Sequence, residues 1–131
     1  QREARHGVLI TAVLLPLNVH LAYQYVARTP ADQPILGAVV AKWPAGRTRL
    51  VLCGWGALPV LAMDGPEASG IEAAARNAAS EASDAWASQD YRQAMAGVLA
   101  RRAVGILETD PHKTVGEVRK QKPTRKVEEE L

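Results

Sequence analysis

The apolar residues of the first third of the chain follow the patterns of a strand, a short helix and a loop. Residues 7–15 are rich in aliphatic and β-branched side chains and end at Pro16, which predicts a buried strand. In residues 18–28 the apolar side chains recur at the spacing of one helix face, and Asn18 is a suitable N-cap, which predicts a short helix. Two prolines in residues 29–34 predict a loop, because proline lacks a backbone donor and restricts the residue before it.

Two further apolar runs predict a β-hairpin. Residues 35–43 and 47–55 form the two strands, and the Pro-Ala-Gly sequence at 44–46 forms the turn. Proline presets one dihedral angle of such a turn, and glycine allows a positive one. Gly54 marks the end of the second strand, where a bend or a close backbone approach is expected. Residues 60–63 predict one more short strand.

From Ser69 onward the apolar period is that of helices. Ser69 and Glu72 have the spacing of a capping box, in which each side chain satisfies a backbone donor. A stripe of small residues follows: Ile71, Ala74, Ala75, Ala78, Ala79 and Ala82. A last helix is predicted over residues 89–107, with Ser88 as its N-cap. Its apolar stripe consists of Tyr91, Met95, Val98, Leu99 and Ile106.

The order of these elements predicts the fold class. A strand, a helix, a hairpin and two helices favour an α+β fold, with an antiparallel sheet of three to four strands and the helices packed on one face. A chain of 131 residues is long enough for one such domain. The domain is expected to occupy residues 1–107. Residues 108–131 are polar and of mixed charge, and they predict a tail with almost nothing to bury.

Composition and charge exclude several classes of function. The chain is 47% apolar and 23% charged with a net charge of +2, which are ordinary globular values. No basic face is interleaved with aromatic residues, which argues against a nucleic-acid-binding protein. The apolar run at residues 8–17 is far shorter than the roughly 20 residues of a membrane span. The single cysteine, Cys53, cannot form an internal disulfide and fits a reducing compartment, so a cytoplasmic location is predicted.

The candidate chemical groups do not form a catalytic or metal site. Cys53 sits in an apolar strand without a neighbouring cation, which indicates a core residue. Residues 53–59 are glycine-rich but lack the phosphate-loop spacings and are not followed by a helix. Asp84 and Asp90 are interpreted as acids near a helix start. The histidines are too far apart in the sequence for a ligand pattern. They are His6, His20 and His112.

Four segments nevertheless follow one another in an order that resembles a known family. They are GVLITAVLLP at 7–16, ARTPADQPILGAVV at 27–40, RLVLCGWGALPVLA at 49–62 and SDAWASQDYRQAMAGVLARRAV at 83–104. The set is similar to the C-terminal domain of the FAD-binding subunit of molybdenum-containing hydroxylases, the xanthine dehydrogenase and carbon monoxide dehydrogenase family. The likeness covers nearly all of the predicted domain and includes a proline-terminated strand, an Arg-x-x-x-Asp loop and a Leu-x-Arg-Arg-Ala run.

The resemblance implies an accessory domain that covers a flavin and contacts partner chains. In that family the flavin takes electrons from iron–sulfur clusters, which a molybdopterin site feeds, and passes them to NAD, oxygen or another acceptor. Leu9 and Ile10 match the strand whose backbone approaches the isoalloxazine ring, Tyr25 matches a flavin-proximal position and Asp32 matches the loop near the ring. FAD is expected to bind only together with an upstream FAD-binding domain, because most binding contacts belong to that domain.

The sequence departs from the family pattern, and an alternative stays open. The nucleotide-cradling domain with its glycine-rich loops is absent from these 131 residues. Tyr25 stands where many members have a lysine, and Leu61 stands where the family has an arginine. The alternative is a stand-alone interaction or dimerisation module without a cofactor, which would use the small-residue face of residues 74–82 and the strand edges.

Overall fold

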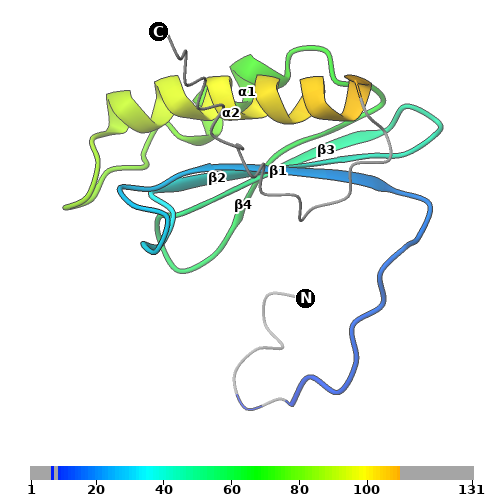
Figure 1. The fold of residues 1–131 in the computed structure, drawn as a ribbon, viewed down its shortest axis with the longest axis horizontal. Helices are drawn as coiled ribbons and strands as arrows, with labels where there is room; N and C mark the ends of the chain where they lie inside the picture. Colours follow the sequence, from blue (N-terminus) through cyan, green and yellow to red (C-terminus); the bar gives the residue numbers. More distant parts are fainter. Residues whose placement is uncertain (1–6, 8, 110–131) are drawn as a thin grey trace, which may run out of the picture.

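The computed structural model describes residue 7 and residues 9–109. A four-stranded antiparallel sheet of order β1-β2-β3-β4 carries two helices on one face (Figure 1). The elements are β1 (His20–Val26), β2 (Leu36–Lys42), β3 (Thr48–Cys53), β4 (Val60–Gly65), α1 (Ile71–Ala78) and α2 (Gln89–Thr109). The predicted α+β class, with helices on one face of an antiparallel sheet, is confirmed.

The helix predicted over residues 18–28 is wrong, because this segment contains strand β1. β1 pairs with β2 in antiparallel register from His20 opposite Lys42 to Val26 opposite Leu36. Alternate side chains therefore point to opposite faces of the sheet, and Ala22 is buried while Tyr25 is exposed. The apolar positions fit the spacing of a helix and also that of a strand, and pairing with β2 favours the strand.

The strand predicted over residues 7–15 is also wrong. Gly7 and residues 9–16 adopt no helix or strand. The large apolar side chains of this segment are exposed: Leu9, Ile10, Val13, Leu14 and Leu15. An apolar run becomes a stable strand only if a neighbouring strand satisfies its backbone groups, and no described strand pairs with this one. We refer to residues 9–17 as the N-terminal segment.

The predicted hairpin and the additional strand are confirmed. The turn between β2 and β3 contains Gly46, whose φ of 95° is the positive value expected from the sequence. In β3 burial alternates strictly, with Thr48, Leu50 and Leu52 buried. β4 completes the sheet beside β3, with a register irregularity between Leu50 and Val51.

Helix α1 is shorter than predicted, and its start has another structure. The N-cap is Gly70 with a φ of 74°, and no side chain caps the helix, so the predicted Ser69–Glu72 capping box is wrong. The helix ends at Ala78, although the small-residue stripe continues to Ala82. Beyond the helix, Ala79 and Ala82 remain fully buried. The small-residue stripe is therefore largely buried, as predicted, but it does not form one continuous helix.

Helix α2 begins and ends close to the predicted residues, but its buried face was misassigned. The Oγ atom of Ser88 accepts a hydrogen bond from the Tyr91 N–H at 3.3 Å, which confirms the predicted N-cap. Tyr91 itself is exposed, whereas the next residue, Arg92, is buried. The buried residues are Arg92, Ala96, Gly97, Leu99, Ala100, Ala103 and Leu107. The helix continues to Thr109, two residues past the predicted end of the domain at residue 107, and residues 110–131 lie outside the described part.

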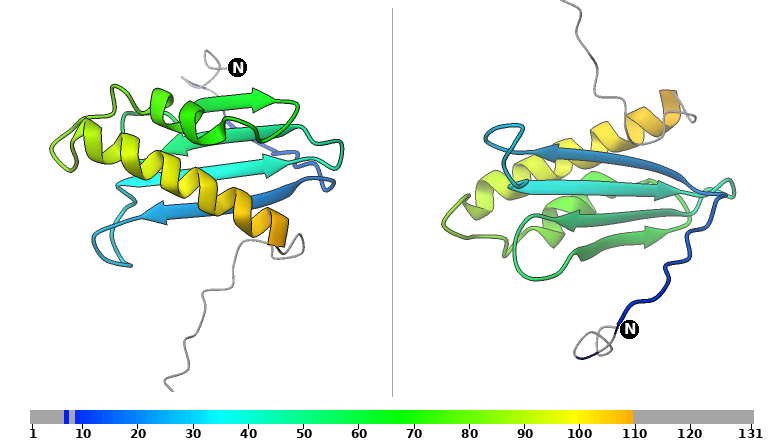
Figure 2. Two further views of the ribbon diagram at one scale, coloured as in Figure 1. Left: turned by 90° about the horizontal axis from the view of Figure 1, so that it is seen from above. Right: turned by 60° about the horizontal axis from the view of Figure 1, so that its bottom comes forward.

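The two faces of the sheet differ in what covers them (Figure 2). α2 packs over β1 and β2, and α1 packs over β4 and β3, so these helices and the sheet enclose the core. No described helix or strand lies on the other face. By the strand register, that face presents Leu21, Tyr23, Tyr25, Val39, Ala41, Val51, Cys53 and Leu61. We call this set the open face.

Candidate functional site

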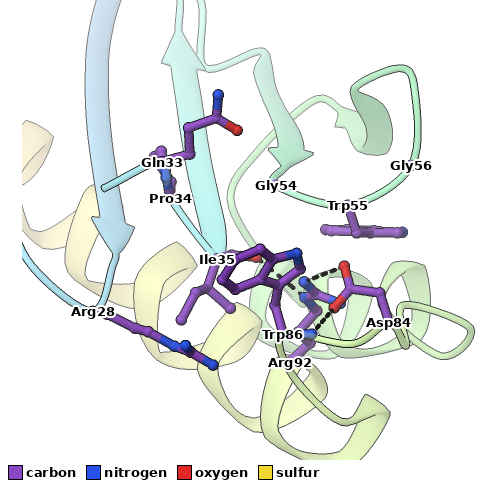
Figure 3. Close-up of a pocket in the computed structure, with 10 residues that line it drawn as sticks. All are labelled: Arg28, Gln33, Pro34, Ile35, Gly54, Trp55, Gly56, Asp84, Trp86 and Arg92. Atoms are coloured by element: carbon purple, nitrogen blue, oxygen red, sulfur yellow. Dashed lines mark hydrogen bonds and ion pairs between the residues drawn. The ribbon is translucent and has the colours of Figure 1, made fainter. Parts of the chain in front are cut away.

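A pocket of about 400 Å³ lies at one end of the sheet (Figure 3). It is formed where β1 ends, β2 begins and β3 ends, and the connection between α1 and α2 closes it. Its lining consists of Arg28, Gln33, Pro34, Ile35, Gly54, Trp55, Gly56, Asp84, Trp86 and Arg92. Four separate stretches of the chain thus meet at one place.

Arg92 holds these stretches together from beneath the pocket. It belongs to the first turn of α2 and is 0% exposed. Its Nε donates to the Ile35 carbonyl oxygen at 3.1 Å, and one terminal nitrogen donates to the Ala82 carbonyl oxygen at 3.0 Å. The other terminal nitrogen donates to Asp84 at 2.8 Å. A buried guanidinium is tolerated because its donors and its charge are satisfied by fixed partners.

Asp84 fixes the loop that leads into α2. One carboxylate oxygen accepts the backbone N–H groups of Trp86 at 2.8 Å and Ala87 at 3.1 Å, while the other pairs with Arg92. These hydrogen bonds, that of Arg92 first, lower the pKa of Asp84 to about 2. The carboxylate therefore remains ionised at neutral pH, and the loop holds Trp86 at the mouth of the pocket.

Two indole rings and one guanidinium define the outer part of the pocket. Trp86 is 65% exposed, and the Arg28 guanidinium lies 5.1 Å from the centre of its ring, a cation–π contact. Trp55 is partly buried against the core and lies on the turn that follows β3. Gly54 makes this turn possible, because its φ is 115° and a Cβ there would lie 2.6 Å from the Ile35 carbonyl oxygen.

The pocket is equipped for binding rather than for acid–base or metal chemistry. Its only carboxylate is held by Arg92, and no serine, cysteine, histidine or lysine lines it. Within residues 7 and 9–109, no group of three or more histidine, cysteine or acidic residues could hold a metal ion. Burial raises the pKa of the Cys53 thiol, which keeps that residue protonated on the open face. No described helix is long and apolar enough to cross a membrane.

The predicted residue Tyr25 lies on the open face. Its side chain is 49% exposed, and its ring stacks on that of Tyr23 with the centroids 5.4 Å apart. Gly37 lies opposite Tyr25 in β2, and a Cβ there would meet Cys53 at 2.8 Å and Tyr23 at 3.0 Å. The glycine thus makes room for Tyr23, and the two tyrosines form a stacked aromatic pair beside it.

The other three predicted residues fall in two places. Asp32 is exposed in the loop between β1 and β2, where a carboxylate oxygen accepts the Thr29 N–H at 3.1 Å and so stabilises the turn. Leu9 and Ile10 are 85% and 76% exposed, in the segment that leads into the start of β1. Tyr25 and Asp32 therefore share one end of β1, whereas Leu9 and Ile10 precede its other end.

Residue patterns alone missed the pocket. The interpretation of Asp84 as a helix-start acid is wrong, because α2 begins five residues later and Asp84 pairs with Arg92 instead. Asp90, in contrast, lies in the first turn as predicted. The apolar pattern placed Tyr91 in the buried stripe, and an arginine one residue away points to another side of the helix, so the Tyr-Arg pair gave no sign that Arg92 is buried.

Comparisons with known proteins agree with this architecture. No family model matches the sequence, and no curated protein matches it. Among solved structures, the Cu,Mo-containing carbon monoxide dehydrogenase in its cyanide-inactivated form is 25% identical, with a TM-score of 0.55. The alignment covers 70% of this chain and 37% of that one. The chain has the fold of part of a carbon monoxide dehydrogenase chain.

Two further structures are similar. Carbon monoxide dehydrogenase from Hydrogenophaga pseudoflava, in a form that lacks the Mo-pyranopterin moiety of the molybdenum cofactor, is 21% identical with a TM-score of 0.52, over 70% of this chain and 37% of that chain. Quinoline 2-oxidoreductase from Pseudomonas putida 86 is 22% identical over 66% of this chain and 35% of that chain, with a TM-score of 0.46 that supports no argument. The chain thus spans little more than a third of the chains it resembles.

Proposed function

We propose that this chain is the accessory C-terminal domain of the FAD-binding subunit of a molybdenum-hydroxylase-type oxidoreductase. The observation that carries the proposal is its similarity to the Cu,Mo-containing carbon monoxide dehydrogenase, at 25% identity over 70% of the chain. Three of the four ordered sequence segments that resemble the family, 27–40, 49–62 and 83–104, contain strands or a helix of the domain. The domain would cover one side of the flavin and contact iron–sulfur and molybdopterin chains.

Two exposed apolar surfaces support a role within a larger subunit. The open face includes Leu21, Tyr25 and Leu61, all exposed. The N-terminal segment adds Leu9, Ile10, Val13, Leu14, Leu15 and Leu17, which are 72% to 99% exposed. Contiguous apolar surface of this kind is typical of an interface with another domain or chain. The small-residue face, in contrast, is used inside the domain, since Ala75 and Ala79 are buried, which weakens the case for a stand-alone module built on that face.

The residues at one end of β1 fit a planar ring system. The rings of Tyr23 and Tyr25 are stacked and Tyr25 is 49% exposed, so an aromatic ring is accessible there, and Asp32 is exposed in the loop that follows β1. Bound FAD would supply the transfer of electrons from iron–sulfur clusters to an acceptor. Tyr25 would present a neutral phenol where many family members have a lysine. Leu9 and Ile10 would join this surface only when the N-terminal segment packs in the assembled subunit.

The experiment is flavin analysis of the complete product of the gene that encodes this chain. The purified protein should be yellow and should release FAD on denaturation. Tyr25→Lys should raise the reduction potential of the flavin, because a nearby cation stabilises the negative charge of the reduced ring. Tyr91→Lys is the matched control, since this tyrosine is exposed on α2, away from the open face, and should leave the potential unchanged.

Two results would contradict the proposal. A colourless gene product without flavin would remove its basis. A homodimer of the flavin-free chain that buries Leu61 and Tyr25 would instead favour the dimerisation module.

A further inference from the structure

We propose that the pocket between Trp55 and Trp86 binds a small planar aromatic anion, such as a bicyclic aromatic carboxylate, with Arg28 as the group that pairs with its charge. This inference goes beyond the proposed function, because the pocket lies outside the surface formed by Tyr23 and Tyr25 and is complete within the described residues. It rests on the shape of the pocket and on the distribution of charge around it.

The shape of the pocket fits a flat ring system. Its volume of about 400 Å³ lies within the range of roughly 300–1,000 Å³ that is typical of ligand sites. The indole rings of Trp55 and Trp86 both border the space (Figure 3). An indole face attracts other aromatic rings by stacking or edge contacts and offers little to a flexible polar ligand. Trp86 is also unusually exposed for its size, which leaves its ring available.

The charge around the pocket favours an anion. Arg92 and Asp84 neutralise each other, and the Arg92 donors are engaged with Asp84 and with backbone oxygens. Arg28, in contrast, pairs with no carboxylate among the described residues, and the central carbon of its guanidinium lies 5.1 Å from the centre of the Trp86 ring. Gln33 also lines the pocket, and its side chain makes no hydrogen bond to another described residue. One uncompensated cation with free donors thus faces an aromatic space.

A second arginine–tryptophan cluster shows what distinguishes the pocket. Arg47 and Arg49 lie 5.6 and 5.7 Å from the ring of Trp43, at the opposite end of β2. There both guanidiniums donate to Asp64, at 2.8 to 3.0 Å, and none of these residues lines the pocket. The same pair of residue types therefore occurs once with both cations hydrogen-bonded to a carboxylate, and once with a cation that lines the pocket and pairs with no described carboxylate. Trp43 and Arg47 provide a matched internal control.

The test is a titration of the full chain with 2-naphthoate, followed by the indole N–H resonances in ¹H–¹⁵N correlation spectra. The chain has three tryptophans, Trp43, Trp55 and Trp86, so each can be assigned by substitution. Saturable shifts of Trp55 and Trp86, without a shift of Trp43, are expected. The uncharged 2-naphthamide and the non-planar decalin-2-carboxylate should each bind about tenfold more weakly, because one lacks the charge and the other the ring.

Three variants locate the site. Arg28→Gln and Trp86→Leu should each weaken 2-naphthoate binding about tenfold, and Arg47→Gln should leave it unchanged. Arg28 and Trp86 are exposed, so both variants should keep the thermal midpoint of the parent chain, which separates loss of binding from loss of fold. The proposal is overturned by equal shifts at all three tryptophans, by equal binding of the amide, or by binding that neither variant weakens. None of these outcomes requires FAD or an upstream domain, so the result is independent of the proposed function.

Discussion

The two faces of the sheet are built from similar apolar side chains but reach different states of burial. On the face covered by the helices, Leu36, Val40 and Leu50 are fully buried. On the open face, Val39 and Val51 are half-buried, and Leu61 is exposed. The strands alternate regularly, so each residue of β2 and β3 belongs clearly to one face. The chain thus completes one core itself and leaves a second apolar surface to be covered by something else.

This difference separates what stabilises the domain from what it offers to a partner. Burial of apolar surface is the main favourable term in folding, so the free energy of unfolding should depend mostly on the covered face and on the groups that close its ends. The open face should contribute to binding instead. Substitutions on the two faces can test this separation directly, from the largest expected effect to the smallest.

The largest effect is expected from Arg92→Ala at the end of the covered face. The substitution removes the guanidinium N–H groups that donate to the carbonyl oxygens of Ile35 and Ala82, and it leaves the Asp84 carboxylate without its cation. Truncation of a large, fully buried side chain typically costs about 3–5 kcal/mol. Urea denaturation of the full chain measures the change. Arg101→Ala, on the exposed side of the same helix, should change stability by less than about 0.5 kcal/mol. Equal effects of the two substitutions would contradict this account of Arg92.

The next largest change in stability is expected in β3, where two neighbouring residues lie on opposite faces of the sheet. Leu50→Ala should lower the free energy of unfolding by about 2–5 kcal/mol, because Leu50 is 0% exposed in the core and leaves a cavity. Val51→Ala, one position along on the open face, should cost about 1 kcal/mol or less. The measurement is again a pair of urea unfolding curves. A larger cost at Val51 would show that the open face is covered in the chain on its own.

A smaller effect is expected where the chain packs through alanine. Ala79→Leu should lower the free energy of unfolding by about 1–3 kcal/mol, because the added methylene groups have no space beside a residue that is fully buried. Ala73→Leu is the matched control on the exposed side of α1 and should be nearly neutral, since leucine and alanine are both good helix formers. The thermal midpoints of the two variants measure the effect. An unchanged midpoint for Ala79→Leu would show that the chain is not tightly packed around residue 79.

The sequence patterns predicted the hairpin, β4 and α2, but neither β1 nor the pocket. The hairpin, β4 and α2 follow from local signals, namely a Pro-Ala-Gly turn, β-branched runs and the Ser88 cap. β1 was misread because its apolar positions satisfy both periods, and only its pairing with β2 decides between them. The pocket depends on contacts between residues far apart in the chain, such as Arg92 with Ile35, which no local pattern contains. Asp32 was placed in the correct loop because proline and aspartate are turn residues.

The smallest effect is expected on the stability at low pH, where the two carboxylates that pair with arginine can be compared. The pKa of Asp84 is lowered to about 2 by the Arg92 hydrogen bond, and that of Asp64 is lowered to about 2 by the Arg47 hydrogen bond. A pKa that is lower in the folded state stabilises the fold at pH values above the ordinary pKa of 3.8. This contribution is lost as the pH falls from 3.8 through about 2.

The partners of these two carboxylates differ in burial, which predicts a difference in the response to salt. Arg92 is fully buried, whereas the Arg47 side chain is 52% exposed, so salt should screen only the Asp64 pair strongly. Asp84→Asn should therefore flatten the dependence of the thermal midpoint on pH between about 4 and 2, in dilute buffer and in about 1 M NaCl. Asp64→Asn should do so only in dilute buffer. If salt abolishes both effects, the Arg92 pair is as accessible to solvent as the surface one, and the covered face is not sealed at the end where the pocket lies.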